Sequence, residues 1–271
     1  MYEGTSNANC RNPSDVTDEG ELRALHETLS RTLPPIAGAV HGAMVLRDTP
    51  IRDMSFEQLT DVLEPKIKGA RYLDRILDRE LDFFILISSM SGLVGNIGQA
   101  NYGAASTFMS TLAARRRQRG LAASVINVGA VMGAGYITRE LSGVEANRVA
   151  RSLGLTWMSV TDVHQMFGEA VLAGRLGSPL DEMEISGGLP EADADGPVLA
   201  GWHSNPIFGR YSRRRQAVSK GVGDTEKVVV PLRERLGAAE TRDDARNLIT
   251  GTCHFHCRTT RGLTSSGRDP V

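Results

Sequence analysis

A hydroxyl cluster follows a run of apolar residues near the middle of the chain. The apolar run covers residues 83–87, and Ser88, Ser89 and Ser91 come directly after it. Tyr102 follows Ser89 by thirteen positions, with glycines between them that allow a tight return. Such a run predicts a buried parallel strand, and ligands bind at the carboxyl ends of these strands. The spacing therefore allows the hydroxyls of Ser89 and Tyr102 to meet over one carbonyl group.

The segment from about Asp15 to Phe208 resembles the ketoreductase domains of fungal polyketide synthases and polyketide–peptide hybrid synthases. These domains are short-chain dehydrogenases/reductases, so the resemblance implies a Rossmann-like α/β fold and reduction of a carbonyl group by NADPH. The specific stretches are residues 38–46 (GAVHGAMVL), residues 64–70 (EPKIKGA), the Ser-Ser block with Gln-Ala-Asn-Tyr at 99–102, and residues 202–208 (WHSNPIF).

The resemblance assigns catalytic roles to four side chains. Tyr102 is the proton donor, and Ser89 orients the carbonyl. Most short-chain reductases have a lysine four residues after the tyrosine, but Ser106 stands there. In polyketide ketoreductases the lysine comes from a Pro-Lys-x-x-Gly pattern, which residues 65–69 match, so Lys66 takes that role. A nearby ammonium is expected to lower the pKa of Tyr102 toward neutrality.

Several of these residues have purely structural alternatives. Ser106 replaces the asparagine of the ketoreductase pattern, which means either a partly rebuilt hydrogen-bond network or weakened catalysis. Ser88 and Ser91 could simply bend the loop. Lys68 lies on another face of its helix and is expected to be solvated. The arginine-rich run at 115–119 is interpreted as a solvated helix end that complements the helix dipole.

Cofactor contacts are likewise implied by the resemblance. Asp15 and Val16 would flank the adenine, and residues 41–43, at the end of a strand, would pass the ribose. Residues 129–131 would line the nicotinamide. A Gly-rich turn for the pyrophosphate is missing, because only Gly4 and Gly20 precede residue 38. The residues expected at the cofactor are Asp15, Val16, His41, Gly42, Ala43, Lys66, Gly129, Ala130 and Val131.

The elements that must position these residues follow from periodicity and punctuation. Helices alternate with short apolar runs, which predicts a parallel sheet with helices on both faces, lacking the first strands and the Gly-rich turn. Pro65 is expected to kink or break its helix. The Gly-rich segment 129–141 would cover the substrate. The expected helices lie near 19–33, 55–77, 99–119 and 159–173, and the expected strands near 36–46, 83–89, 123–128 and 183–186.

Composition limits the class of protein. The chain has 271 residues, and its hydrophobic content of 41% is typical of a soluble globular protein. Its net charge of −1 does not favour binding to nucleic acid. No apolar run is long enough to cross a bilayer, so a cytoplasmic location is expected. Three cysteines do not suggest a disulfide framework, and the Cys253–Cys257 cluster lacks the usual zinc-ligand spacing, so no metal is expected.

The sequence divides into five parts by composition and resemblance. Residues 1–14 are expected to be a disordered lead, 15–208 a partial ketoreductase domain, and 209–227 a linker. Residues 228–250 resemble the opening helix of an acyl carrier domain without its attachment serine. Residues 251–271 are expected to be an aberrant or disordered tail.

Two functions remain open at this stage, with a weaker third. The first is NADPH-dependent reduction of a β-keto acyl thioester held on the phosphopantetheine of an acyl carrier domain, alongside other synthase domains. The second is an inactive segment of such a synthase that cannot bind the cofactor. The third, a free-standing reductase of small alcohols, is disfavoured by the carrier-like helix.

Overall fold

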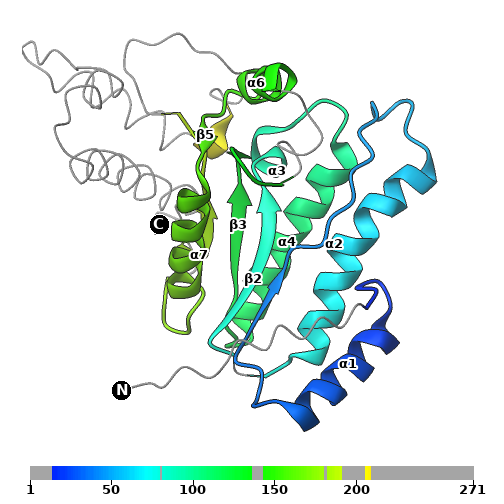
Figure 1. Cartoon of the computed structure of the whole chain (residues 1–271), viewed down its shortest axis with the longest axis vertical. Coiled ribbons are helices and arrows are strands. Elements are labelled where there is room, and N and C mark those ends of the chain that lie inside the picture. The colour runs from blue at the N-terminus through cyan, green and yellow to red at the C-terminus, as the bar shows by residue number, and fades with distance from the viewer. Residues whose placement is uncertain (1–13, 80, 136–142, 180–181, 191–204, 209–271) are drawn as a thin grey trace, which may run out of the picture.

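The computed structural model describes residues 14–79, 81–135, 143–179, 182–190 and 205–208. Helices and strands alternate along this part of the chain (Figure 1). The helices are α1 (Glu19–Thr32), α2 (Phe56–Ile76), α3 (Ser91–Val94), α4 (Ala100–Gln118), α6 (Gly143–Ser152) and α7 (Val160–Ala173), with a 3-10 turn, η3, at Pro206–Phe208. The strands are β1 (Gly38–His41), β2 (Phe83–Ser89), β3 (Ser124–Val128), β4 (Ala130–Val131), β5 (Trp157–Met158) and β6 (Glu184–Ser186).

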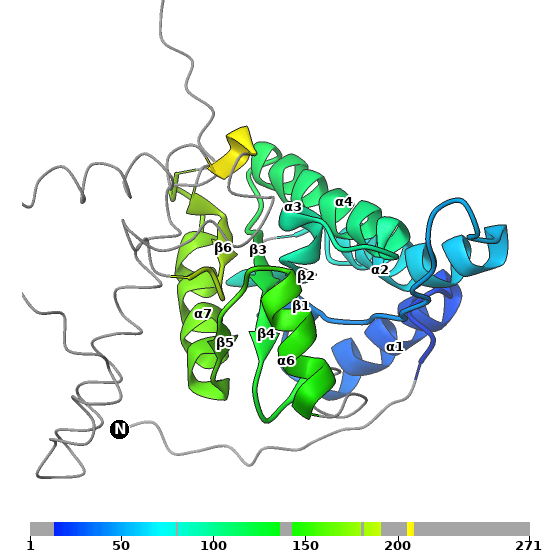
Figure 2. The same cartoon turned by 90° about the horizontal axis from the view of Figure 1, so that it is seen from above.

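Four strands form the central sheet in the order β1-β2-β3-β6, and all neighbours are parallel. Seen from above, α7 covers one face while α2 and α4 cover the other (Figure 2). The expected α/β class with a parallel sheet and helices on both faces is confirmed. β1 is the edge strand of the described sheet, and no strand precedes α1 in the part that the structure describes.

Side-chain caps set the starts of three helices. The Asp18 carboxylate accepts from the Glu21 amide at the start of α1. Ser55 begins α2 and Ser159 begins α7, each in a capping box that satisfies two amides. The predicted break at Pro65 is wrong, because α2 runs through it as one helix. Packing of α2 on the sheet and on α4 outweighs the one backbone hydrogen bond that a proline removes.

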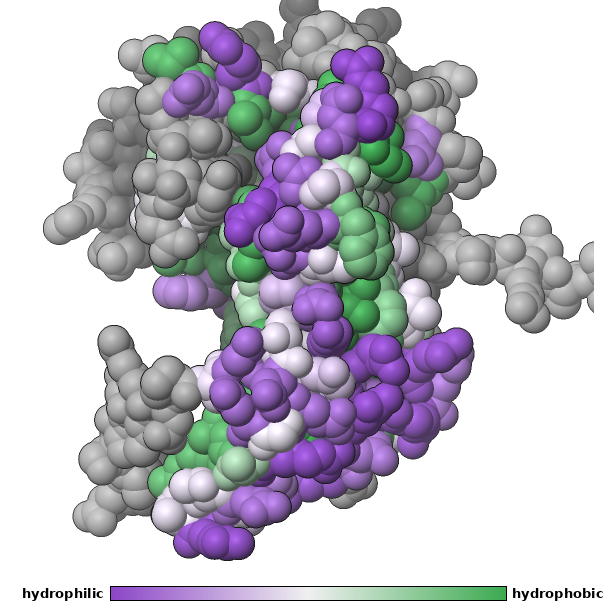
Figure 3. Space-filling model, turned by 90° about the vertical axis from the view of Figure 1, so that its right-hand side faces the viewer, coloured by the Kyte–Doolittle hydropathy of each residue, from purple (hydrophilic) through white to green (hydrophobic). Residues whose placement is uncertain are grey.

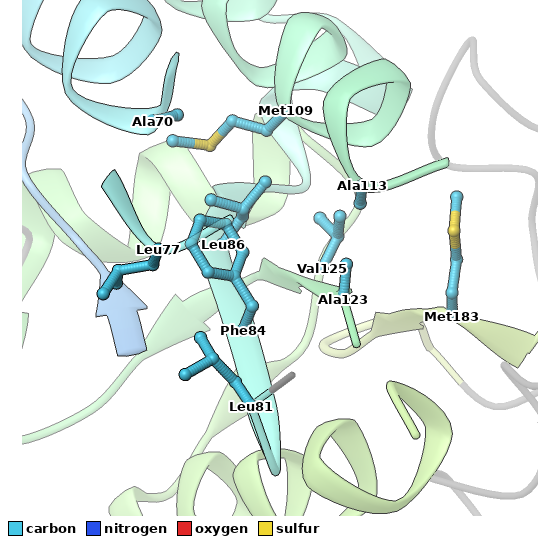
Figure 4. Packing of buried hydrophobic residues seen from close by; sticks show 10 residues of the cluster. All are labelled: Ala70, Leu77, Leu81, Phe84, Leu86, Met109, Ala113, Ala123, Val125 and Met183. Atoms are coloured by element: carbon cyan, nitrogen blue, oxygen red, sulfur yellow. The ribbon is translucent and has the colours of Figure 1, made fainter. Parts of the chain in front are cut away.

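The core lies where α2 and α4 meet the sheet (Figure 4). Ala70, Met109 and Ala113 project from the two helices toward Phe84 and Val125 on the strands. Alanines at the helix positions let the helices approach the sheet closely, and the larger strand side chains fill the space between. A second apolar cluster on the opposite face, built around Ile85, Ile126 and Met166, holds α7 against the strands.

The structure corrects the interpretation of the arginine run at the end of α4. Arg116 is fully buried, stacks 4.2 Å from the Phe84 ring centroid, and pairs with Asp74 at 2.7 Å. Arg117 is 8% exposed and donates to backbone carbonyls, including that of Gly174 at 2.7 Å. These two guanidinium groups join α4 to the ends of α2 and α7, so only part of the run is solvated.

A small parallel sheet of β4 and β5 follows β3 and was not predicted, nor was α6. Strands of two residues leave no periodic signal in a sequence. The segment 129–141, expected to cover the substrate, lies partly outside the described residues. The expected linker, carrier-like helix and tail lie wholly outside them. In the described ranges no helix is long and apolar enough to span a membrane.

Candidate functional site

The candidate site lies at the carboxyl end of β2, beside the start of α4. Met90 donates its amide to the Val128 carbonyl, so the turn after β2 stays against β3. Asn101 then places the first turn of α4: its amide group donates to the carbonyls of Arg47 and Gln58, and its side-chain oxygen accepts from the Tyr102 amide. These contacts join the chain after β1, the start of α2 and the start of α4 around Tyr102.

Ser89 and Tyr102 come together as their spacing predicted. Interaction with the Ser89 side chain lowers the pKa of the Tyr102 phenol, but burial raises it more, and the charge of Asp48 raises it further. The expected net lowering of the Tyr102 pKa is therefore wrong for this structure. The phenol, 7% exposed, is protonated at neutral pH, which is the state of a proton donor.

Lys66 reaches the same place from α2. Its ammonium lies 5.0 Å from the centroid of the Tyr102 ring and donates to the Ile87 carbonyl at 2.9 Å. The residue is 1% exposed, and burial lowers its pKa to about 8. Because the cation lies over the ring face, it contacts the π system of Tyr102. Lys68 behaves as expected: it pairs with Glu64 near the surface at 2.6 Å.

Ser106 lies one helical turn after Tyr102, and its hydroxyl is buried without a hydrogen-bond partner among the described residues. Its backbone carbonyl accepts from Ser88 at 3.4 Å. Gly92 packs against it, since a Cβ at Gly92 would lie 2.8 Å from the Ser106 Cβ. Ser89 instead bonds to the Ser91 amide and hydroxyl, which fixes the turn. The hydroxyl of Ser106 thus has unused hydrogen-bonding capacity beside the candidate catalytic residues.

The residues expected near adenine and ribose gather at the carboxyl end of β1. Val16 packs over Gly69 of α2, and His41 packs against the same glycine. Asp15 accepts hydrogen bonds from Thr17, which lower its pKa. Gly42 and Ala43 follow His41. A Cβ at Gly42 would lie 3.7 Å from Ile87, an ordinary contact distance, so the packing of the chain does not itself require glycine there. The missing side chain leaves space beside the backbone.

The expected nicotinamide segment continues from β3. Gly129 cannot carry a side chain, because a Cβ there would lie 2.7 Å from the Gly187 carbonyl oxygen. Ala130 is buried, and Val131 pairs with Met158 in the small sheet. This segment is therefore held rigidly next to the carboxyl ends of β3 and β6.

Sequence reasoning missed the structural role of Asn101 and the contact that His41 makes with Lys66. Asn101 is 1% exposed, and both ends of its side-chain amide hydrogen-bond to backbone groups. The sequence feature that could have indicated this role is its position directly before Tyr102. His41 was expected at the cofactor ribose, but its contact with Lys66 was not predicted. It is 3% exposed, and its Nε2 bonds to the Lys66 carbonyl at 3.2 Å.

Other concave or ligating features do not coincide with this site. A hollow of about 440 Å³ lies between α2 and α4 on their outer side, and Phe108, Leu112 and four arginines line it together with Asp74 and Thr111. None of the candidate residues lines it. The side of the molecule that carries α1 and α2 is mainly hydrophilic (Figure 3). The described residues hold no metal-binding group of His, Cys, Asp or Glu, and Cys253–Cys257 lies outside them.

Residues 6–133 match the family model described as the KR domain. The chain is 44% identical over 260 residues to the highly reducing polyketide synthase calA of Penicillium decumbens, covering 95% of this chain and 9% of that protein. It is 43% identical over 237 residues to the hybrid PKS-NRPS synthetase poxE of Penicillium oxalicum, covering 87% of this chain and 6% of that protein. The chain thus spans less than a tenth of these relatives.

Solved structures agree with the sequence comparison. The first-module ketoreductase PlmKR1 of phoslactomycin biosynthesis from Streptomyces sp. HK803 has a TM-score of 0.55 and 34% identity, covering 61% of this chain and 37% of that one. A structure of an A1-type ketoreductase has a TM-score of 0.56 and 26% identity, covering 70% of this chain and 39% of that one. The Rossmann-like fold follows from this likeness.

Proposed function

Because the chain carries a KR domain related to those of fungal highly reducing polyketide synthases and polyketide–peptide hybrids, we propose that it serves the reduction of a carrier-bound β-keto acyl thioester to a β-hydroxy acyl thioester. One observation carries this proposal. Side chains from three separate segments converge at one point: the Lys66 ammonium lies 5.0 Å from the Tyr102 ring centroid, and Ser89 interacts with the phenol of Tyr102.

The residues present suit the nicotinamide and ribose half of NADPH. The Lys66 ammonium has three N–H donors and one described acceptor, the Ile87 carbonyl, so two donors remain for ribose hydroxyls. Gly42 and Ala43 let the backbone pass close to a sugar. When bound, NADPH supplies the hydride for the carbonyl carbon.

The chain's own groups then handle the oxygen of the carbonyl. Ser89 donates a hydrogen bond that orients and polarises it, and Tyr102 donates the proton as negative charge develops there. The raised pKa of Tyr102 keeps this proton in place at neutral pH. Lys66 stabilises the phenolate that remains after the transfer. Ser106, one turn away, has a free hydroxyl that suits a bridging water.

An assay with a small thioester tests this proposal. The full chain would be given millimolar NADPH and the N-acetylcysteamine thioester of acetoacetate, and NADPH consumption followed by absorbance. We expect Tyr102→Phe to lose activity by at least about 100-fold, because the proton donor is gone. Tyr72→Phe on α2 is the matched control and keeps the wild-type rate. Equal rates for the wild type and Tyr102→Phe would contradict the proposed mechanism.

A second candidate function also has a specific observation behind it. The chain holds no Gly-rich turn between a strand and a helix ahead of α1, since Gly4 and Gly20 are its only glycines before Gly38. In dinucleotide folds such a turn, with the helix N-terminus behind it, seats the pyrophosphate. On this alternative the chain would be a non-catalytic segment of a synthase. Absence of turnover in the wild type, even at millimolar NADPH, would support this alternative.

The proposed partners follow from the same relationship. An acyl carrier domain would present the thioester on its phosphopantetheine, and further synthase domains would make and use it. The linker at 209–227 and the carrier-like segment at 228–250 lie outside the described residues, and their roles stay predictions.

A further inference from the structure

Two side chains, those of Val16 and His41, pack at Gly69 in the middle of α2. A Cβ at this position would lie 2.5 Å from Cγ2 of Val16 and 2.7 Å from Cε1 of His41. Both distances are far below a normal carbon–carbon contact, so only glycine lets the two groups rest on the helix. Gly69 follows Lys66 by three residues and therefore lies on the same side of α2. The glycine of the Pro-Lys-x-x-Gly pattern thus leaves the space in which the His41 ring packs against α2.

From this position His41 bonds to Lys66. Its Nε2 lies 3.2 Å from the Lys66 carbonyl oxygen, and because a carbonyl only accepts, Nε2 is the donor. The ring is neutral at neutral pH, since burial and the nearby Lys66 cation lower its pKa to about 4. The neutral ring therefore carries its proton on Nε2, which fixes the tautomer.

Lys66 is consequently held at both ends. Its carbonyl is bonded to His41 at the end of β1, and its ammonium is bonded to the Ile87 carbonyl of β2. These are neighbouring strands of the sheet, in which His41 is opposite Leu86. A helix residue tied to two adjacent strands cannot rotate or slide without breaking one of the bonds. The ammonium is directed over the Tyr102 ring as a result.

We propose that His41 is a positioning residue, which holds the backbone of α2 at Lys66 and so keeps the ammonium beside Tyr102, with Val16 packed at the same glycine. Its relevance to catalysis rests on the proposed function, but the geometric effect does not. Val16 belongs to the pair expected to flank the adenine. The same contact set therefore joins the expected adenine end of the site to the lysine at its catalytic end.

The lysine content of the chain makes a direct test practical. There are four lysines, at positions 66, 68, 220 and 227, so isotope-labelled lysine gives few NMR signals. The Lys66 signal is identified by its loss in Lys66→Met. A pH titration of the full chain is expected to give a Lys66 pKa of about 8, while Lys68, whose pKa its pairing with Glu64 raises, titrates higher.

His41→Leu should raise the Lys66 pKa by one unit or more, a tenfold or larger gain in proton affinity, because the released ammonium gains access to water. His41→Gln keeps a side-chain N–H donor and should leave the Lys66 pKa near its wild-type value. Lys68 should not move in either variant. A folded His41→Leu protein with an unchanged Lys66 pKa would overturn the proposal, because a merely space-filling histidine predicts that result.

A second pair of variants keeps the test informative if His41→Leu does not fold. Gly69→Ala leaves His41 in the chain but displaces its ring from the helix, and should raise the Lys66 pKa as well. Gly168→Ala on α7 is the control, since nothing lies within 4 Å of a Cβ there. An unmoved Lys66 pKa in folded Gly69→Ala would overturn the proposal. No substrate or cofactor is present, so the result is independent of whether Tyr102 proves catalytic.

Discussion

Lys66 carries its charge in a place that is closed to water. Burial lowers its pKa from 10.5 to about 8. Between these two values the unfolded chain still binds a proton that the folded chain has released, so stability rises with pH across this window. Below it the buried charge costs about 3 kcal/mol of stability. A protein retains such a cost where the charge has a use, which agrees with the role proposed for Lys66.

We therefore expect Lys66→Met to raise the free energy of unfolding at neutral pH by about 1–2 kcal/mol, less than the whole cost because the bond to Ile87 is lost too. The gain should shrink as the pH rises from 8 to 10.5. Urea unfolding at several pH values measures both effects. Lys68→Met, on the same helix but near the surface, should leave the free energy of unfolding almost unchanged. A gain that grows with pH would contradict the assigned cause.

Ser106 offers a second residue-scale test, because its buried hydroxyl has no partner among the residues that the structure describes. Ser106→Ala should leave the free energy of unfolding unchanged or raise it by about 1 kcal/mol, since an unpaired buried group is removed. Ser88→Ala is the matched control: its hydroxyl donates to the Ser106 carbonyl, and its loss should cost about 0.5–1 kcal/mol. If Ser106→Ala proves the more damaging change, the hydroxyl has a partner such as ordered water.

At the scale of elements, Arg116 joins α4 to α2. Its guanidinium donates to the Asp74 carboxylate and to the carbonyls of Leu77 and Ala122, and it is fully buried. Removing it leaves the Leu77 and Ala122 carbonyls without this donor, while Asp74 keeps its pairing with Arg119. Arg116→Met should therefore lower the free energy of unfolding by about 2–3 kcal/mol. Denaturant unfolding would measure this loss.

Arg115 is the matched control for this prediction, because it is the neighbouring arginine on the same helix and is exposed. Arg115→Met should change the free energy of unfolding by about 0.5 kcal/mol or less. Similar losses in the two variants would show that the Arg116 contacts do not hold α2 and α4 together.

The elements of the fold differ in how far the sequence alone predicts them. The apolar run at Phe83–Ser89 and the amphipathic pattern at 159–173 each specify an element locally, and both elements were predicted with nearly correct bounds. The burial of Arg116 was not predictable, since adjacent arginines look alike until tertiary packing selects one. The continuity of α2 through Pro65 was hard to predict for a similar reason, because the packing that keeps the helix unbroken comes from distant residues.

The candidate site likewise combines residues that local motifs predict with contacts that only the folded chain creates. Ser89 and Tyr102 were predicted from their types and spacing and Lys66 from the family resemblance, and the structure brings the three side chains together, while their catalytic roles stay predictions. The hydrogen bond from His41 to Lys66 joins residues 25 positions apart, and no local pattern encodes it. The net rise of the Tyr102 pKa was missed because burial, its largest cause, is a property of the folded chain.

At the scale of the molecule, the proposed function assigns the ribose and nicotinamide half of a dinucleotide site to the described fold. The carboxyl ends of β1, β2 and β3 carry the expected ribose, catalytic and nicotinamide residues, while β1 forms the edge of the described sheet. A dinucleotide gains much of its affinity from pyrophosphate contacts with a Gly-rich turn and helix N-terminus. The sequence ahead of α1 has no such turn, and no basic residue was assigned to a 2′-phosphate.

This distribution predicts how the chain given binds nicotinamide cofactors. We expect NADPH to bind with a Kd of about 1 mM, a free energy near −4 kcal/mol, because only the ribose and nicotinamide contacts contribute. NADH should bind within about threefold of NADPH, since the two differ only in the 2′-phosphate, for which we assign no residue among those that the structure describes. Fluorescence titration of both cofactors against the full chain measures this. Lys66→Met should weaken both equally, because Lys66 is expected at a ribose that they share. Micromolar binding of NADPH with a tenfold preference over NADH would show that other residues of the chain supply a phosphate site, and that the view of the chain as half a site is wrong.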